Sequence, residues 1–153
     1  MRRALAGLTA AVFAVVLAAT ADGDAGPRVV VRTAAGDEVA EADAGRGFAL
    51  AYRHSVYRSP AEERFRAGAG GGFDLVEIAS PSEAVLDYYA LDWRKARRCA
   101  TWVLRPARPP HFSVLALAGT RVGRRTLVAA GRRTPLWRPD GRAAHLRITV
   151  TGR

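Results

Sequence analysis

Short runs of residues typical of β-strands recur about every ten positions along this chain, and they constrain its fold more than any other feature. Residues 28–33 (RVVVRT) form a β-branched run, and residues 47–56 (GFALAYRHSV) alternate strictly between two faces. Turn-forming glycine and proline separate the runs. This spacing predicts an all-β fold, either a small antiparallel sandwich or a partly open barrel. Further strands are expected at 62–67, 73–78, 102–106, 112–118, 125–130 and 144–151.

One segment departs from this pattern. In residues 80–91 (SPSEAVLDYYAL), Ser80 is expected as an N-cap, Pro81 suits the first helical position, and Glu83 completes a capping box. These residues predict one short helix over 84–89, with a strand over the same residues (AVLDYY) as the alternative.

Two segments lack any apolar alternation, and a third carries a turn. The basic residues 94–99 (RKARRC) and the proline-containing residues 105–110 (RPARPP) are expected to be loops. Residues 129–134 (AAGRRT) are expected to form a tight hairpin between two strands.

The N-terminus has the pattern of an export signal. Arg2 and Arg3 precede an uncharged apolar run over 4–19, and Ala19-Thr20-Ala21 fits the small-x-small cleavage pattern. This predicts a helical signal peptide over 1–21, with a retained membrane anchor as the alternative. Residues 22–153 are then expected to form a single β-rich domain. The protein is expected outside the cytoplasm, either secreted or tethered by an uncleaved leader.

Charge is distributed unevenly along the 153 residues, which carry a formal net charge of +10. From Asp22 to Asp92 there are 13 acidic residues and 7 arginines, whereas from Trp93 to Arg153 there are 15 basic residues and only Asp140. The basic half predicts contact with an acidic partner, such as an anionic envelope surface or an acidic protein face. Nucleic acid is not expected as the partner of an exported chain.

Few residues are suited to metal binding or redox chemistry. Cys99 is the single cysteine, which excludes a disulfide framework and a cysteine-based zinc site within one chain. The three histidines, His54, His111 and His145, are far apart in the sequence. No metal and no cofactor is therefore expected.

The hairpin over 47–65 holds the candidate site. By alternation, His54 shares the face of Phe48, Leu50 and Val56, and Glu63 faces the same side from the returning strand. Because an unpaired polar group there would cost about 1–3 kcal/mol, both side chains are expected to have partners, with each other as one option. Such a pair is either a structural contact that sets strand register or part of a binding pocket.

Ser55 adjoins His54, but neighbouring strand residues point to opposite faces, so His54 is not expected to serve Ser55 as a base. No nucleophile-elbow motif occurs. No residue is assigned a catalytic role, and a binding function is favoured over an enzyme. His54, Ser55 and Glu63 remain as candidate binding residues.

The motifs F-x-L-x-Y-x-H-S-V over 48–56 and S-P-x-E-E-x-F over 59–65 resemble the signature of a bacterial exported family, the domain of unknown function 1850. The family has no established activity, and its motif residues correspond here to His54, Ser55 and Glu63. Its members are often encoded beside TRAP transporters of the TAXI type. The resemblance implies an accessory protein of solute uptake whose partner is the transporter's receptor or permease.

Three functions follow from these observations. The first is an exported accessory or binding protein of TRAP-type solute uptake. The second is a small enzyme or ligand-binding domain that uses a pocket at His54 and Glu63. The third is an envelope-binding protein that uses the basic C-terminal half.

Overall fold

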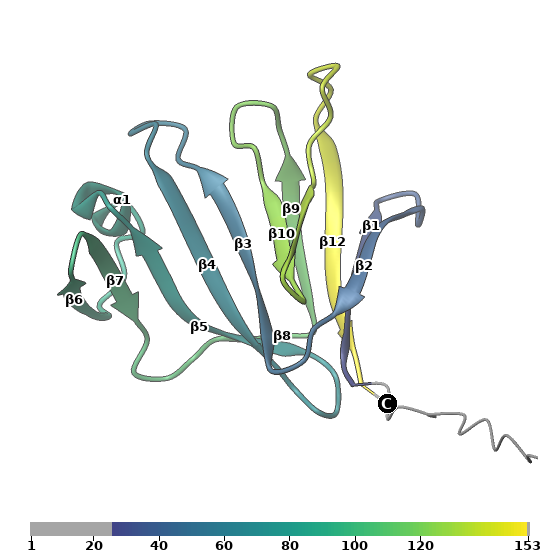
Figure 1. The fold of residues 1–153 in the computed structure, drawn as a ribbon, viewed down its shortest axis with the longest axis horizontal. Helices are drawn as coiled ribbons and strands as arrows, with labels where there is room; N and C mark the ends of the chain where they lie inside the picture. Colours follow the sequence, from purple (N-terminus) through teal and green to yellow (C-terminus); the bar gives the residue numbers. More distant parts are fainter. Residues whose placement is uncertain (1–25, 153) are drawn as a thin grey trace, which may run out of the picture.

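The structure is a computed structural model that describes residues 26–152, so the signal peptide expected over 1–21 lies outside the described residues. Among these described residues, strands make up 54% and helix 4%, and two antiparallel sheets pack face to face (Figure 1). The expected sandwich with one short helix is confirmed. Within residues 26–152 the two sheets do not close into a barrel.

The small sheet has four strands in the order β2-β1-β12-β9. Its central strand β1 is the β-branched run predicted from the sequence, and Val29 and Val31 on its inner face are fully buried. The expected strand at the C-terminal end, β12, pairs with β1 from Arg28 opposite Thr151 to Thr33 opposite Leu146. The strands are β1 (Arg28–Thr33), β2 (Glu38–Asp43), β9 (Val114–Gly119) and β12 (Ala144–Thr151).

The large sheet has the order β11-β10-β3-β4-β5-β7-β6, with the two-residue strand β8 paired to the start of β5. The helix α1 (Glu83–Asp87) follows β5. The strands are β3 (Gly47–Arg53), β4 (Pro60–Ala67), β5 (Phe73–Ser80), β6 (Arg94–Arg98), β7 (Thr101–Arg105), β8 (His111–Phe112), β10 (Thr126–Ala129) and β11 (Arg132–Pro135).

The hairpin predicted from the alternation is formed by β3 and β4, and it lies in the middle of the large sheet. Phe48 pairs with Phe65 and Leu50 pairs with Glu63, which places these four side chains on the inner face. Phe48 and Phe65 stack at 5.0 Å, and both meet Phe73 of β5 edge-on at 5.2 and 5.4 Å. Each fully buried phenyl group contributes about 1.5–3 kcal/mol to the hydrophobic core.

A β-bulge in β5 changes which of its residues face the core. Phe65 pairs with Leu75 but Arg64 pairs with Glu77, so Val76 is an extra residue without a partner. Beyond the bulge, Ile78 faces inward opposite Glu63, and Glu77 faces outward opposite Arg64. Strict alternation along 73–78 would place Glu77 on the same face as Phe73 and Leu75, and the bulge moves it to the other face.

The helix α1 is shorter than expected and begins differently. It spans Glu83–Asp87, and its N-cap residue is Ser82, whose side chain makes no capping hydrogen bond. The prediction that Ser80 is the N-cap is wrong because Ser80 ends β5, where its hydroxyl donates to the carbonyl of Pro60 at 2.8 Å. Val85 and Leu86 are buried and cover the inner face of the large sheet.

The basic segment expected to be a loop is the edge strand β6. All five of its residues are exposed, so no apolar alternation marks it. Backbone pairing with β7 holds it in the sheet, and a two-residue turn at Cys99 and Ala100 joins the two strands. Lys95 and Arg97 also lie 5.8 and 5.7 Å from the ring centroid of Trp102, where their charges meet its π face.

The expected tight hairpin at residues 129–134 is confirmed. Ala129 pairs with Arg132, and the two residues between them, Ala130 and Gly131, have φ values of 47° and 70°. Positive φ at both central positions is the geometry that matches the right-handed twist of the flanking strands.

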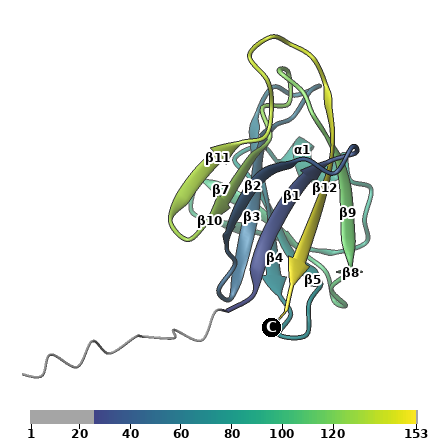
Figure 2. The same cartoon turned by 90° about the vertical axis from the view of Figure 1, so that its right-hand side faces the viewer.

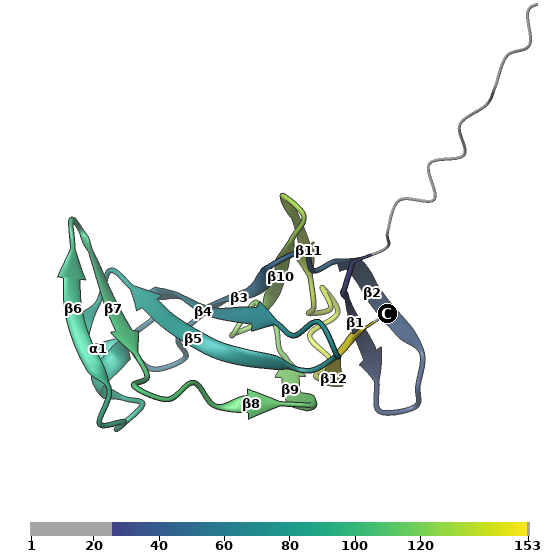
Figure 3. The ribbon, with the colours of Figure 1, turned by 90° about the horizontal axis from the view of Figure 1, so that it is seen from below.

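Two further views show how the sheets are arranged. Figure 2 looks onto the small sheet, with strands of the large sheet behind it. Figure 3 shows that the large sheet is strongly curved, so that the β6–β7 and β10–β11 ribbons rise on the side away from β9 and β12. In the described part of the chain, no helix has the length and apolar character needed to cross a membrane.

Candidate functional site

The candidate residues gather at one end of the sandwich, around a hollow we call the hairpin cavity. It has a volume of about 480 Å³ and lies beside the β3–β4 turn, the end of α1 and the loop from β9 to β10. His54, Ser55 and Glu63 all line it. The lining residues are Tyr52, Arg53, His54, Ser55, Glu63, Tyr88, Tyr89, Ala118, Thr120, Val122, Gly123 and Arg125.

His54 is buried, with 6% of its surface exposed, although β3 ends one residue before it. The turn folds back over it, since its backbone N–H donates to the Ser59 carbonyl at 2.9 Å and its carbonyl accepts from Arg58 N–H at 2.8 Å. Val56, expected on the same face, is instead 59% exposed because the chain leaves the strand at His54 and its alternation ends there.

The imidazole of His54 is held in one orientation. The backbone N–H of Tyr57 donates to Nδ1 at 3.3 Å, which leaves Nε2 to carry the hydrogen of the neutral ring. The ring stacks on Tyr57 at 5.2 Å and meets Tyr88 edge-on at 4.7 Å. Within residues 26–152, every fully buried side-chain nitrogen or oxygen has a hydrogen-bond partner. Nε2 of His54 has no hydrogen-bond partner among these residues, so it is not fully buried and keeps access to solvent at the cavity.

Glu63 also lines the hollow, with 14% of its side chain exposed. Tyr89 Oη donates to Oε1 at 2.8 Å, and Arg125 Nη1 donates to Oε2 at 3.4 Å. Tyr52 Oη is hydrogen-bonded to Tyr89 Oη. Because the Tyr89 proton points to the carboxylate, Tyr52 is the donor in that contact, and the chain of donors runs from Tyr52 through Tyr89 to Glu63.

The two candidate residues do not satisfy each other. Glu63 pairs with Leu50, four positions before His54, and strand residues advance about 3.3 Å each. The separation along the strands is therefore about 13 Å, too far for a hydrogen bond. The option of a direct His54–Glu63 pair is wrong, because each has its own partners, but both side chains face the same cavity.

Burial and neighbouring charge keep both phenols protonated. Burial is the main cause that raises the pKa of Tyr52 to about 12, with Glu63 adding to the shift. The pKa of Tyr89 is raised further, first by burial and then by the Glu63 carboxylate. Arg125 lies over the Tyr52 ring at 4.9 Å, so a cation, an anion and two neutral hydroxyls form one connected network.

This network predicts a loss of stability at alkaline pH. An unfolded chain releases the Tyr52 proton near a pKa of 10.0, whereas the folded chain retains it to about pH 12. The stabilisation is complete below pH 10 and falls as the pH rises through this window, because the folded state binds more protons there. In urea unfolding from pH 9 to 12, we expect the wild-type midpoint to fall more steeply than that of Tyr52→Phe. Equal slopes would contradict the assignment.

The mouth of the hairpin cavity is apolar and aromatic. Tyr88 and Val122, which line it, are 60% and 52% exposed, and Tyr57, which contacts both His54 and Tyr88, is 45% exposed. An apolar rim above a few oriented polar groups is the usual composition of a site for a small molecule.

The cavity offers groups for binding. Ser55 is exposed at the cavity, and no hydrogen bond in the described structure joins it to His54. Within residues 26–152, no three His, Cys, Asp or Glu side chains are grouped so as to hold a metal ion. Cys99 is exposed in the turn between β6 and β7.

Sequence reasoning did not identify several members of the site. Tyr88 and Tyr89 were recognisable only as an aromatic pair at the end of the predicted helix, and Arg125 is one arginine among many in the basic half. Their roles depend on tertiary contacts, since Arg125 is 62 residues from Glu63 in the sequence.

Comparison with protein-family models, with curated proteins and with solved structures gives no match to this chain. The resemblance to the domain of unknown function 1850 stays a prediction from the hairpin motifs.

Proposed function

We propose that this chain is a non-enzymatic binding protein that holds a small polar ligand in the hairpin cavity and serves solute uptake as an exported accessory protein. The observation that carries the binding function is the network at the cavity floor. There the Glu63 carboxylate, the Arg125 guanidinium and the Tyr52–Tyr89 pair are fixed by mutual contacts before any ligand arrives. Groups oriented in advance lose little entropy on binding, which favours affinity.

The charges at the cavity indicate the class of ligand. Arg53 and Arg125 outnumber Glu63 among the charged lining residues, which favours a ligand with a carboxylate. Glu63 and His54 Nε2 offer an acceptor and a donor to a second polar group. A small organic acid that also carries a hydroxyl or amino group fits this set, with its apolar part against Tyr88 and Val122.

The test of the binding function compares two histidine variants. A panel of hydroxy acids and amino acids is screened by thermal shift, and each hit is titrated by calorimetry against wild type, His54→Gln and His111→Gln. His111 is exposed at β8, at the opposite end of the sandwich, and serves as the matched control (Figure 1). We expect His54→Gln to weaken binding about tenfold, from loss of one hydrogen bond and the ring contacts, and the control to leave it unchanged.

Unchanged ligand affinity in His54→Gln would contradict the binding role of His54. If His54→Gln melts earlier but binds every hit as wild type does, the imidazole is a structural group of the turn. Thermal unfolding of both variants without ligand separates these two roles.

The uptake context rests on the hairpin motifs and the N-terminal export pattern. It predicts a complex with the receptor or permease of a TRAP transporter encoded beside it. Co-purification of the full chain with each candidate at low and high salt tests this. Absence of a salt-sensitive complex would remove the TRAP context and leave the binding function standing.

A further inference from the structure

A second hollow, which we call the outer trough, lies on the other face of the large sheet. It has a volume of about 490 Å³ and is lined by five arginines from separate parts of the chain. These are Arg53, Arg58, Arg64, Arg124 and Arg133, with Glu62 as the one acidic residue. We propose that the outer trough binds a small soluble ligand that carries phosphate groups.

Strand register and sheet curvature together build the trough. Ala51 pairs with Thr126, and Glu62 pairs with Ala79. The small side chains of Ala51, Thr126 and Ala79, from neighbouring strands, form a low floor on the outer face. Its lining runs from Arg133 on β11 across the sheet to Thr101 on β7. Because the ribbons at both ends of the sheet rise on this side, the floor is recessed between them (Figure 3).

Most of the arginines lack an acidic partner. Arg64 is paired, since it contacts Glu62 at 2.7 Å and Glu77 at 2.5 Å. In the described part of the chain, no ion pair involves the other four. Arg53 Nε donates to the carbonyl of Arg58 at 2.9 Å, and Arg124 lies over the Trp137 ring at 5.8 Å.

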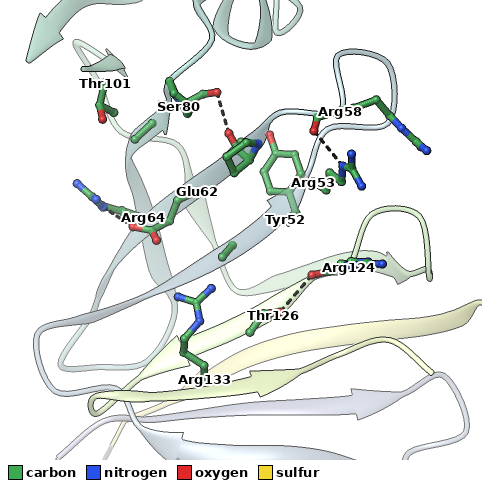
Figure 4. A pocket seen from close by; sticks show the side chains of 15 residues that line it. Tyr52, Arg53, Arg58, Glu62, Arg64, Ser80, Thr101, Arg124, Thr126 and Arg133 are labelled. Atoms are coloured by element: carbon green, nitrogen blue, oxygen red, sulfur yellow. Dashed lines mark hydrogen bonds and ion pairs between the residues drawn. The ribbon is translucent and has the colours of Figure 1, made fainter. Parts of the chain in front are cut away.

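Figure 4 shows Arg133 extending from its strand across the hollow, toward the strands that carry Glu62 and Arg64. Glu62 is already used by Arg64, so this guanidinium faces the hollow without a counter-charge of its own. Like charges around one hollow repel one another, and a ligand of opposite charge removes this repulsion. Because five cations and one anion line the trough, the matching ligand carries several negative charges.

Arginine favours phosphate in particular. Its planar fork of donors matches two oxygens of one oxyanion, whereas lysine acts as a point charge, and the trough contains no lysine. A phosphate group offers up to two charges and several acceptor oxygens, enough for more than one guanidinium at once. The Thr101 hydroxyl at the far end, which makes no hydrogen bond to another described residue, adds a neutral donor.

The shape of the trough favours a soluble molecule over a membrane surface. Its volume lies in the range of small-molecule sites, about 300–1,000 Å³. A flat bilayer would meet the raised ribbons before its headgroups reached the floor. The floor of the trough is on the opposite face of the sheet from Glu63, and among the lining residues the two hollows share Tyr52 and Arg53 at the end of β3.

The experiment titrates the full chain with inorganic pyrophosphate by calorimetry at several salt concentrations. Arg124→Gln/Arg133→Gln removes two charges that line the trough but not the hairpin cavity, and Arg142→Gln/Arg147→Gln removes two exposed charges just before and within β12 as a matched control. We expect the trough variant to bind pyrophosphate at least about tenfold more weakly than wild type and the control to stay within about twofold. All four arginines lie outside the core, and thermal unfolding checks that each variant is folded.

Several outcomes would overturn the proposal. No heat of binding by the wild type at low salt, or equal weakening in both variants, would show that no built phosphate site exists. Citrate binding as tightly as pyrophosphate with the same dependence on Arg133 would replace phosphate by carboxylate. In co-sedimentation with phosphatidylglycerol vesicles, we expect the trough variant to behave as wild type. Selective loss in that variant would assign the trough to a lipid headgroup instead.

Discussion

Replacing Phe73 with alanine is expected to lower the free energy of unfolding by about 3–5 kcal/mol. Phe73 is 1% exposed, and its ring contacts three others, Phe48, Phe65 and Phe112, the last at 5.8 Å. Removing the ring breaks all three of these contacts and leaves a cavity between the strands. Domains of this size are stable by about 5–15 kcal/mol, so the variant should be marginal.

Guanidinium unfolding followed by circular dichroism measures this loss. Phe73→Leu is the matched variant, because it keeps most of the volume and should cost less than about 1.5 kcal/mol. If the alanine variant unfolds within 1 kcal/mol of wild type, the cluster does not form the core that the structure shows.

Replacing Glu77 with glutamine is expected to cost about 2–3 kcal/mol. Glu77 is 3% exposed and lies among three arginines on the outer face, with Arg64 at 2.5 Å, Arg98 at 3.9 Å and Arg105 in direct contact. Glutamine keeps the shape but loses the charge and turns an amide donor toward a guanidinium. The arginines are about half exposed and regain water, so the cost stays below that of a fully buried pair.

Glu62→Gln is the control for this change. Glu62 lies on the same face of the sheet, with 29% of its side chain exposed, and among the described residues it forms an ion pair only with Arg64. An ion pair of that kind contributes less than about 1 kcal/mol. A loss for Glu77→Gln no larger than for Glu62→Gln, measured by chemical unfolding, would show that burial adds nothing to the Glu77 contacts.

The fold class followed from local sequence rules because most strands carry their own signal. The valine run of β1 and the alternation of β3 each place apolar side chains on a face that only a sheet can bury. The Ala130–Gly131 turn carries the conformation that a two-residue hairpin needs. In these segments, local preference and tertiary packing agree.

The local rules failed where tertiary structure decides the conformation. Nothing in FDLVEIAS shows that Val76 is the bulged residue, since the bulge is a property of the pairing with β4 and not of β5 alone. The strand β6 forms because β7 offers an unpaired edge, and its own residues would equally suit a loop. Ser80 has the residue type of an N-cap, but pairing with Trp102 keeps it in the strand.

The candidate site was partly predictable for the same reason. Alternation correctly placed His54 and Glu63 on the inner side of one hairpin, because that depends only on the strands themselves. The partners of Glu63 come from the end of α1 and from the start of β10, and no local pattern connects these segments.

The composition of β6 and β11 has a consequence for how copies of this protein meet. These two strands are the free edges of the large sheet, and they present Arg94, Lys95, Arg97 and Arg98 at one end and Arg132 and Arg133 at the other. Joining two copies through either edge would set rows of cations directly against each other, which opposes pairing. The unpaired backbone groups of both edge strands are thereby kept from pairing with another copy of the chain. Added salt screens the repulsion, so edge-to-edge association should become easier as the salt concentration rises.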